Sequence, residues 1–179
     1  YYDYENGHEP DFNGKETFKG SIVHPQHWPD DLDYKDKNVV VIGSGATAVT
    51  LIPSMANETK HITMLQRSPT YYMVRPNIDP LGAFFRKFMG KTVSYFVMRW
   101  KNIQLQSWFF KRARKNPSQI KQFLIGVVKE KLNPSFDIEK HFTPSYNPWE
   151  QRLCLVPDGD LFEAINDGKA SVVTDHIDQ

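Results

Sequence analysis

Residues 37–48 read Lys37-Asn-Val-Val-Val-Ile42-Gly43-Ser-Gly45-Ala-Thr-Ala48, a short apolar run that ends in a glycine-rich turn. The run is rich in β-branched residues, which predicts a parallel-sheet strand buried on both faces. Helical spacing of apolar residues then extends from Ala46 to about Met55, and residues 61–66 predict a second strand. A strand, glycine turn, helix and strand within about thirty residues form a βαβ unit. We therefore expect an α/β, Rossmann-like domain built on a parallel sheet.

The glycine turn predicts a dinucleotide site. Gly43 permits the tight bend, Gly45 lets the main chain approach a pyrophosphate, and Ala48 allows close packing of helix on strand. The N-terminus of the following helix would hold the phosphates. The candidate cofactor-binding residues of the turn are Gly43, Ser44, Gly45, Ala46, Thr47 and Ala48. The alternative is a glycine-rich connection that binds no ligand.

The end of the second strand indicates which dinucleotide binds. NAD sites place an acid there for the ribose 2′-hydroxyl, whereas an arginine accommodates the 2′-phosphate of NADP. This chain has Gln66-Arg67-Ser68 and no acid next to it in the sequence. Arg67 can pair with the phosphate bidentately and Ser68 can donate a hydrogen bond, so we expect NADP(H). A surface arginine without a ligand is the alternative.

The other segments complete the expected organisation. Loops are predicted at 1–37, 70–80 and 133–149, helices at 81–115, 117–132 and 160–166, and strands at 152–156 and 171–174. Asp158 is a candidate N-cap of the last helix, and Gly168 a candidate C-terminal stop. The expected divisions are a linker at 1–37, an NADP-binding βαβ unit at 38–80, a helical insertion at 81–132 and an incomplete remainder of the NADP-binding domain at 133–179.

The composition limits which kinds of protein the chain can be. The 179 residues are 40% hydrophobic and 24% charged, as in an ordinary globular domain. Cys154 is the one cysteine, and no Cys/His cluster has zinc spacing, so we expect no metal and a cytoplasmic location. No apolar run is long enough to span a bilayer. The start of the chain lacks a signal-peptide pattern and is interpreted as lying inside a longer protein.

Charge is distributed unevenly along the chain. Residues 81–131 contain twelve Lys or Arg and one acid, Glu130, so this block carries +11 while the remainder carries −10, which gives the net +1. Such a block often meets an anionic partner. The candidates are a nucleotide phosphate, the acidic remainder of the same protein, or peripheral contact with a membrane, and the alternative is a solvated helical cover over the core. We expect no nucleic-acid partner.

A second motif lies upstream of the glycine turn. Residues 18–29 contain Phe-x-Gly-x-x-x-His-x-x-x-Trp-Pro, with its fixed positions at Phe18, Gly20, His24, Trp28 and Pro29. This pattern resembles the fingerprint of Baeyer–Villiger monooxygenases, which are class B flavin-dependent monooxygenases. Further similar stretches occur at 39–49, 64–70, 146–149 and 151–160. The chain as a whole resembles the middle third of such an enzyme, in the branch that includes the ethionamide-activating monooxygenase.

The resemblance implies roles for particular residues. In that family the fingerprint lies on the linker between the FAD and NADP domains, and the histidine at position 24 is implied to couple domain movement to cofactor state. Phe18 and Trp28 would be packing residues of the linker. Without the resemblance, His24 is equally well explained as an imidazole hydrogen-bonded to the main chain of a proline-rich loop.

The same resemblance implies a catalytic arginine at Arg152, before Leu153-Cys154. A fixed guanidinium stabilises developing negative charge without losing its proton. The alternative for Arg152 is an ion pair with Asp158 or Asp160. Many members have a lysine before this arginine as a further 2′-phosphate contact, and here the position is Gln151.

The implied activity is oxygenation of ketones or thio-compounds with NADPH, O₂ and a peroxyflavin. One glycine turn is found, so the main FAD site is expected on another part of the polypeptide, and this piece alone is expected to be inactive. A flavin-containing N- or S-monooxygenase is the nearest alternative. An NADP-dependent dehydrogenase is less favoured because no Tyr-x-x-x-Lys pair occurs.

Overall fold

The structure, a computed structural model, describes residue 7 and residues 10–178; residues 1–6, 8 and 9 of the expected linker lie outside the described part. Its strands are β1 Asn38–Ile42, β2 His61–Gln66, β3 Tyr71–Arg75, β4 Leu153–Pro157 and β5 Ala170–Thr174. Its helices are α1 Ala46–Met55, α2 Pro80–Lys115, α3 Pro117–Lys131, α4 Ile138–Phe142 and α5 Asp160–Asn166. Short 3₁₀ turns lie at Lys15–Thr17 and Pro25–His27. The predicted α/β class is confirmed.

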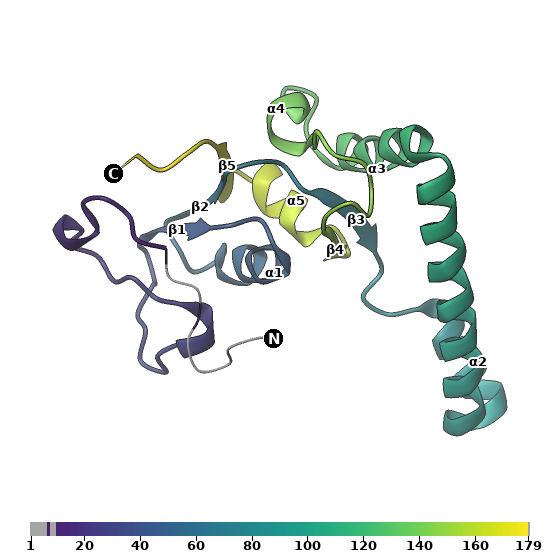
Figure 1. The fold of residues 1–179 in the computed structure, drawn as a ribbon. Helices are drawn as coiled ribbons and strands as arrows, with labels where there is room; N and C mark the ends of the chain where they lie inside the picture. Colours follow the sequence, from purple (N-terminus) through teal and green to yellow (C-terminus); the bar gives the residue numbers. More distant parts are fainter. Residues whose placement is uncertain (1–6, 8–9, 179) are drawn as a thin grey trace.

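The strands form two parallel sheets. One sheet has the order β1-β2-β5, and the other pairs β3 with β4. Helix α1 contacts β1, β2 and β4, while α5 contacts β4 and β5, so these two helices lie between the sheets (Figure 1). Because β1, β2 and β5 are parallel, their carboxyl ends lie at the same edge of the first sheet. This is the edge at which ligands bind in parallel sheets.

The prediction that the first strand is buried on both faces was wrong. Val39 and Val41 pack against the core, but Val40 and Ile42 are each 58% exposed. The physical reason is that α1 covers one face of β1, and β1 is an edge of the sheet among the described residues. An apolar run alone does not distinguish a strand covered on one side from one covered on both.

Two segments predicted as loops contain regular structure. Within 70–80, β3 pairs in register with β4, from Tyr71 opposite Leu153 to Arg75 opposite Pro157. Within 133–149, α4 begins after Asp137, whose carboxylate accepts a hydrogen bond from the N–H of Lys140 at 3.0 Å. Both elements were missed because the prolines around them predicted loops.

The predicted N-cap of the last helix was also wrong. Gly159, with φ +89°, precedes α5 and makes no side-chain cap. Asp158 itself has φ +52°, and its carboxylate accepts from the N–H of Asn77 at 3.1 Å, so it joins the loop after β3 to the end of β4. Gly168, with φ +72°, follows α5 as predicted.

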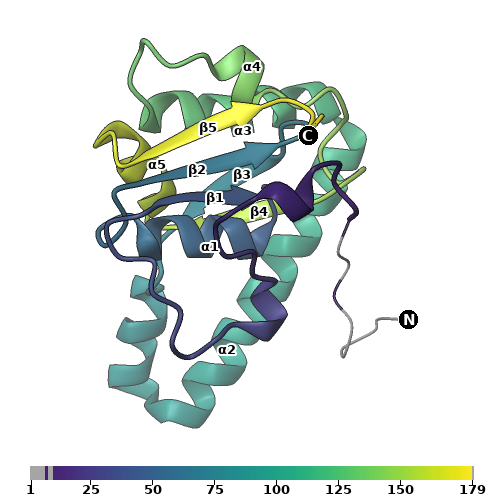
Figure 2. The same cartoon turned by 90° about the vertical axis from the view of Figure 1, so that its left-hand side faces the viewer.

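The predicted helical block is present as α2 and α3. Helix α3 buries Ile120, Leu124 and Val128 and contacts β3. Helix α2 has a break at Gly90, with φ +72° and ψ 172°, and extends away from both sheets (Figures 1 and 2). The alternative interpretation of the basic block, a solvated helical cover over the core, therefore describes α3 but does not describe α2. Among the described residues, no helix combines the length and apolar character that crossing a bilayer requires.

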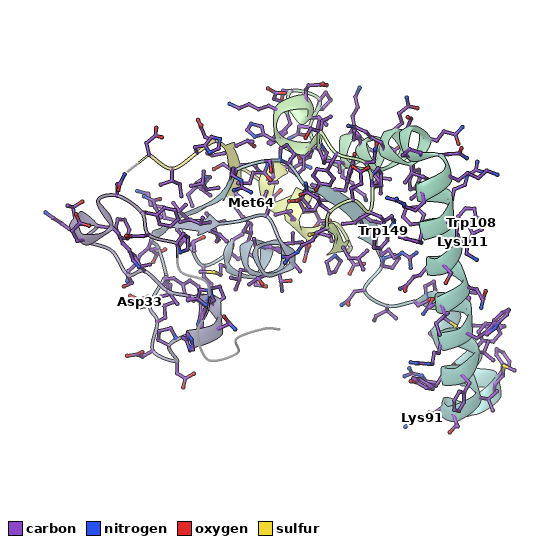
Figure 3. All side chains as sticks on the ribbon, viewed as in Figure 1. Asp33, Met64, Lys91, Trp108, Lys111 and Trp149 are labelled. Carbon is purple, nitrogen blue, oxygen red and sulfur yellow. The ribbon has the colours of Figure 1, made fainter. Side chains whose placement is uncertain are left out.

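An aromatic cluster fills the core between the sheets. Tyr72, Phe142 and Phe162 are each 1% exposed, and their ring centroids lie 5.5–6.2 Å apart in edge-on pairs. They come from β3, α4 and α5, so one cluster joins three elements that are distant in sequence. Met64 of β2 lies in the same core (Figure 3).

Candidate functional site

The glycine turn connects β1 to α1. Gly43 has φ +123°, a conformation that disfavours side chains, and its N–H donates to the carbonyl of Leu65 at 2.7 Å. Gly45 precedes α1 in an extended conformation, and Ala48 is buried in the core. The exposed residues Ala46 and Thr47 open the helix, where N–H groups have no intrahelical acceptor. The turn thus has the geometry of an anion-binding strand–helix connection.

A cleft of about 490 Å³ lies at the carboxyl edge of the first sheet. Gly43 and Ser44 of the turn line it, and so do Arg67 and Ser68 after β2. The fold therefore brings the two predicted halves of a dinucleotide site together. Arg67 is exposed, and no ion pair involving it occurs among the described residues.

An acid that the sequence did not suggest also lines the cleft. Asp175 follows β5, and its N–H donates to the carbonyl of Gln66 at 3.0 Å. Its carboxylate accepts from the N–H of His176 at 2.8 Å, and His176 lines the cleft as well. The available signal was its position just after a predicted strand, since parallel strands end at a shared edge. A carboxylate here can accept hydrogen bonds from hydroxyl groups of a ligand.

Two buried donors hold the main chain of the turn from the second sheet. The hydroxyl of Tyr72 donates to the carbonyl of Ser44 at 3.3 Å, and the thiol of Cys154 approaches the same oxygen at 3.7 Å. Burial raises the pKa of Tyr72 and the pKa of Cys154, although Arg152 opposes the shift of the thiol. Both groups stay protonated at neutral pH and remain donors. Sequence reasoning missed Tyr72 because its strand was predicted as a loop.

Arg152 lies next to the glycine turn. A Cβ added at Gly45 would be 3.6 Å from its Nη1, so the guanidinium borders the main chain of the turn. Asp158 and Asp160 make main-chain contacts instead, and no ion pair joins either of them to Arg152 in the described part of the chain. The side chain of Arg152 is exposed, which leaves its charge available to a ligand.

The fingerprint residues lie outside the cleft. His24 Nδ1 accepts from the N–H of Gln26 at 3.3 Å, a local main-chain contact. Trp28 packs edge-on against Tyr34 at 6.2 Å, as expected for a packing residue of the linker, whereas Phe18 is exposed and covers Gly20. Pro29 accepts from Leu32 in a turn. A role of His24 in coupling domain movement stays a prediction. Among the described linker residues, Pro10 and Phe12 line the cleft.

Comparison with curated proteins identifies close relatives. The FAD-containing monooxygenase EthA of Mycobacterium tuberculosis is 49% identical over 180 residues, covering 100% of this chain and 37% of the relative. The probable FAD-binding monooxygenase AlmA of Acinetobacter baylyi is also 49% identical, covering 100% of this chain and 36% of the relative. The chain thus spans little more than a third of the length of these proteins.

Solved structures share the fold. A steroid monooxygenase bound to NADP superposes with a TM-score of 0.69 at 18% identity, covering 95% of this chain and 39% of that one. A cyclohexanone monooxygenase from Rhodococcus sp. Phi1 bound to NADP⁺ gives 0.66 at 19% identity, covering 93% and 38%. The model of the flavin-binding monooxygenase-like family matches residues 4–138, three quarters of the chain. The chain belongs to the flavin-binding monooxygenase-like family.

Proposed function

We propose that the chain is the NADP(H)-binding portion of a longer, FAD-dependent monooxygenase of the Baeyer–Villiger type, which oxygenates ketones or thio-compounds with O₂. The fingerprint at 18–29 favours this subgroup within the family. The relatives named above as FAD-containing or FAD-binding monooxygenases support the cofactor assignment. When bound, NADPH supplies a hydride and the flavin supplies the oxidising chemistry.

The residues of the cleft fit NADP(H). Main-chain N–H groups of the Gly43–Ala48 turn would bind the pyrophosphate, and Asp175 would accept from a ribose hydroxyl. Arg67 and Ser68 would bind the 2′-phosphate. Because Gln151 supplies no charge, Arg67 would carry most of the preference for NADP over NAD. We place FAD on the rest of the longer polypeptide.

The observation that carries this proposal is that Arg67 and Ser68 line the same cleft as Gly43 and Ser44. The direct test uses the intact protein with bound FAD under argon. NADPH should bleach the flavin absorbance, and NADH should do so poorly. Product analysis with a ketone and with an amine separates Baeyer–Villiger chemistry from N-oxygenation. An intact, FAD-loaded protein that consumes no NADPH with any ketone or thioether would contradict the proposal.

Removal of the Arg67 guanidinium should abolish the cofactor preference. In Arg67→Ala the loss of a charge-assisted contact should raise the KM for NADPH about 10- to 100-fold. The KM for NADH should change little, because NADH lacks the 2′-phosphate, so it serves as the internal control. The measurement is steady-state consumption of NADPH and of NADH at varied cofactor concentration. Equal handling of NADPH by the variant and the unmodified protein would remove Arg67 from the site.

Loss of the Tyr72 hydroxyl should weaken cofactor binding more modestly. In Tyr72→Phe the Ser44 carbonyl loses a donor, and we expect the KM for NADPH to rise about two- to tenfold, the range of one neutral hydrogen bond. The matched control is Tyr71→Phe, whose hydroxyl donates to the carbonyl of Tyr146. An equal rise of the KM for NADPH in both variants would mean that it results from a general disturbance of the second sheet and not from the lost donor to Ser44.

A further inference from the structure

The projecting helix α2 is a hairpin. The break at Gly90 divides it into residues 80–89 and 91–115, and we call the whole the α2 hairpin. The hydroxyl of Ser94 donates to the carbonyl of Gly82 at 3.4 Å, and Lys101 pairs with Asp79 at 2.5 Å, so the two arms are held side by side. Its tip, at Lys91, lies far from both sheets (Figure 3).

Large aromatic side chains of the hairpin face outward. Phe88 is 67% exposed, Phe96 63% and Trp100 66%. Other exposed aromatic residues of the hairpin are Phe84, Tyr95, Trp108 and Phe110. Soluble surfaces seldom gather so many large apolar groups, and such a patch marks contact with a partner or a membrane.

The hairpin is also strongly cationic. Residues 80–115 contain nine Lys or Arg and no acid. The capping residue Asp79 is already paired with Lys101. The hairpin therefore combines a high positive charge with a large exposed apolar area.

Part of this charge lines a groove between the two arms. The groove has a volume of about 770 Å³ and is lined by Arg86, Lys91 and Arg99. Phe88, Phe96 and Trp100 are not part of its lining. Tyr95 lines the groove together with these cations, so only some of the exposed rings of the hairpin lie outside it.

We propose that the α2 hairpin docks on the surface of an anionic phospholipid bilayer. Arg86, Lys91 and Arg99 bind headgroup phosphates at the groove, while Phe88 and Trp100 enter the boundary between headgroups and acyl chains. Guanidinium groups suit phosphate oxygens, and aromatic rings favour this interfacial depth. This inference goes beyond the proposed oxygenation and does not depend on it.

Charge complementarity favours a bilayer over a protein surface. A protein interface that buried the aromatic rings would have to place acids opposite up to eight unpaired cations, whereas an anionic bilayer needs no such positional match. An anionic bilayer places a dense layer of phosphates directly above an apolar layer. Both features of the hairpin are then satisfied by one partner.

The test is flotation of the intact, FAD-loaded protein with lipid vesicles. The protein should float with vesicles of equal parts phosphatidylcholine and phosphatidylglycerol, and much less with phosphatidylcholine alone. In the triple variant Arg86→Ala, Lys91→Ala, Arg99→Ala the partition coefficient should fall about 100-fold, since each cation near such a surface contributes about fivefold. An unchanged far-UV circular dichroism spectrum of this variant would show that it is folded.

The matched control removes the same charge from exposed positions elsewhere, with Lys19→Ala, Lys35→Ala and Lys60→Ala. Its partition coefficient should fall by less than about tenfold, because these cations act only through weak long-range attraction. A separate measurement uses brominated lipid, which should quench Trp100 fluorescence. The quenching that comes from Trp100 should disappear in Trp100→Phe.

Two results would overturn the inference. One is an unmodified protein that does not float with anionic vesicles, which would mean that the rest of the polypeptide or a second copy covers the hairpin. The other is an equal loss of binding in the two triple variants, because net charge rather than the groove would then determine binding.

Discussion

Replacement of Arg152 by alanine is expected to lower the rate of substrate oxygenation by about 10²- to 10³-fold, the usual effect of removing one preorganised group from developing negative charge. Flavin reduction by NADPH should change much less. The guanidinium borders the glycine turn and has no acidic partner among the described residues, so its charge is not neutralised within this part of the protein. The measurement compares single-turnover flavin reduction with product formation.

The matched control for this experiment is Arg152→Lys. Lysine keeps the charge but loses the planar fork of donors, so partial recovery of oxygenation is expected. Full activity in Arg152→Ala would mean that the arginine has no part in the chemistry. An equal loss in both steps would instead assign Arg152 to cofactor binding, which its position beside Gly45 also allows.

Truncation of Phe162 should be the most destabilising of the changes considered. Phe162 is 1% exposed and packs against Tyr72 and Phe142, so Phe162→Ala removes a ring from the centre of the core. We expect a loss of about 3–5 kcal/mol in the free energy of unfolding, the range for buried Phe→Ala changes. Hydrogen exchange of the β2 and β5 amides in the intact protein would measure it locally.

The control is the same substitution at an exposed phenylalanine. Phe123 of α3 is largely exposed, and Phe123→Ala should change the free energy of unfolding by no more than about 0.5 kcal/mol. Similar losses in the two variants would show that the cluster of Tyr72, Phe142 and Phe162 does not anchor this part of the fold.

The βαβ unit could be predicted from sequence because its signals are local. The apolar run before Gly43, the helical spacing after Gly45 and the strand at 61–66 each lie within one element. The strand at 71–75 was missed because its partner, 153–157, lies far along the chain and prolines surround it. The burial of β1 on one face depends on which helices cover that face. The local sequence of β1 does not indicate this.

The site was predictable where residues follow directly from strand ends. Arg67 and Ser68 line one cleft with Gly43 and Ser44 because parallel strands end at the same edge. Asp175 reaches that cleft only through the pairing of β5 with β2. Arg152 was identified by resemblance alone, since no spacing rule connects it to the glycine turn.

The Ser44 carbonyl connects the glycine turn to both strands of the second sheet. Tyr72 and Cys154 hold it from neighbouring strands, β3 and β4. Strand β3 leads into the α2 hairpin, and β4 receives the chain after α4. The α2 hairpin therefore follows directly on the sheet whose side chains contact the glycine turn. A motion of the hairpin that displaced β3 would also displace the Tyr72 hydroxyl from the Ser44 carbonyl, and any such coupling would act in both directions.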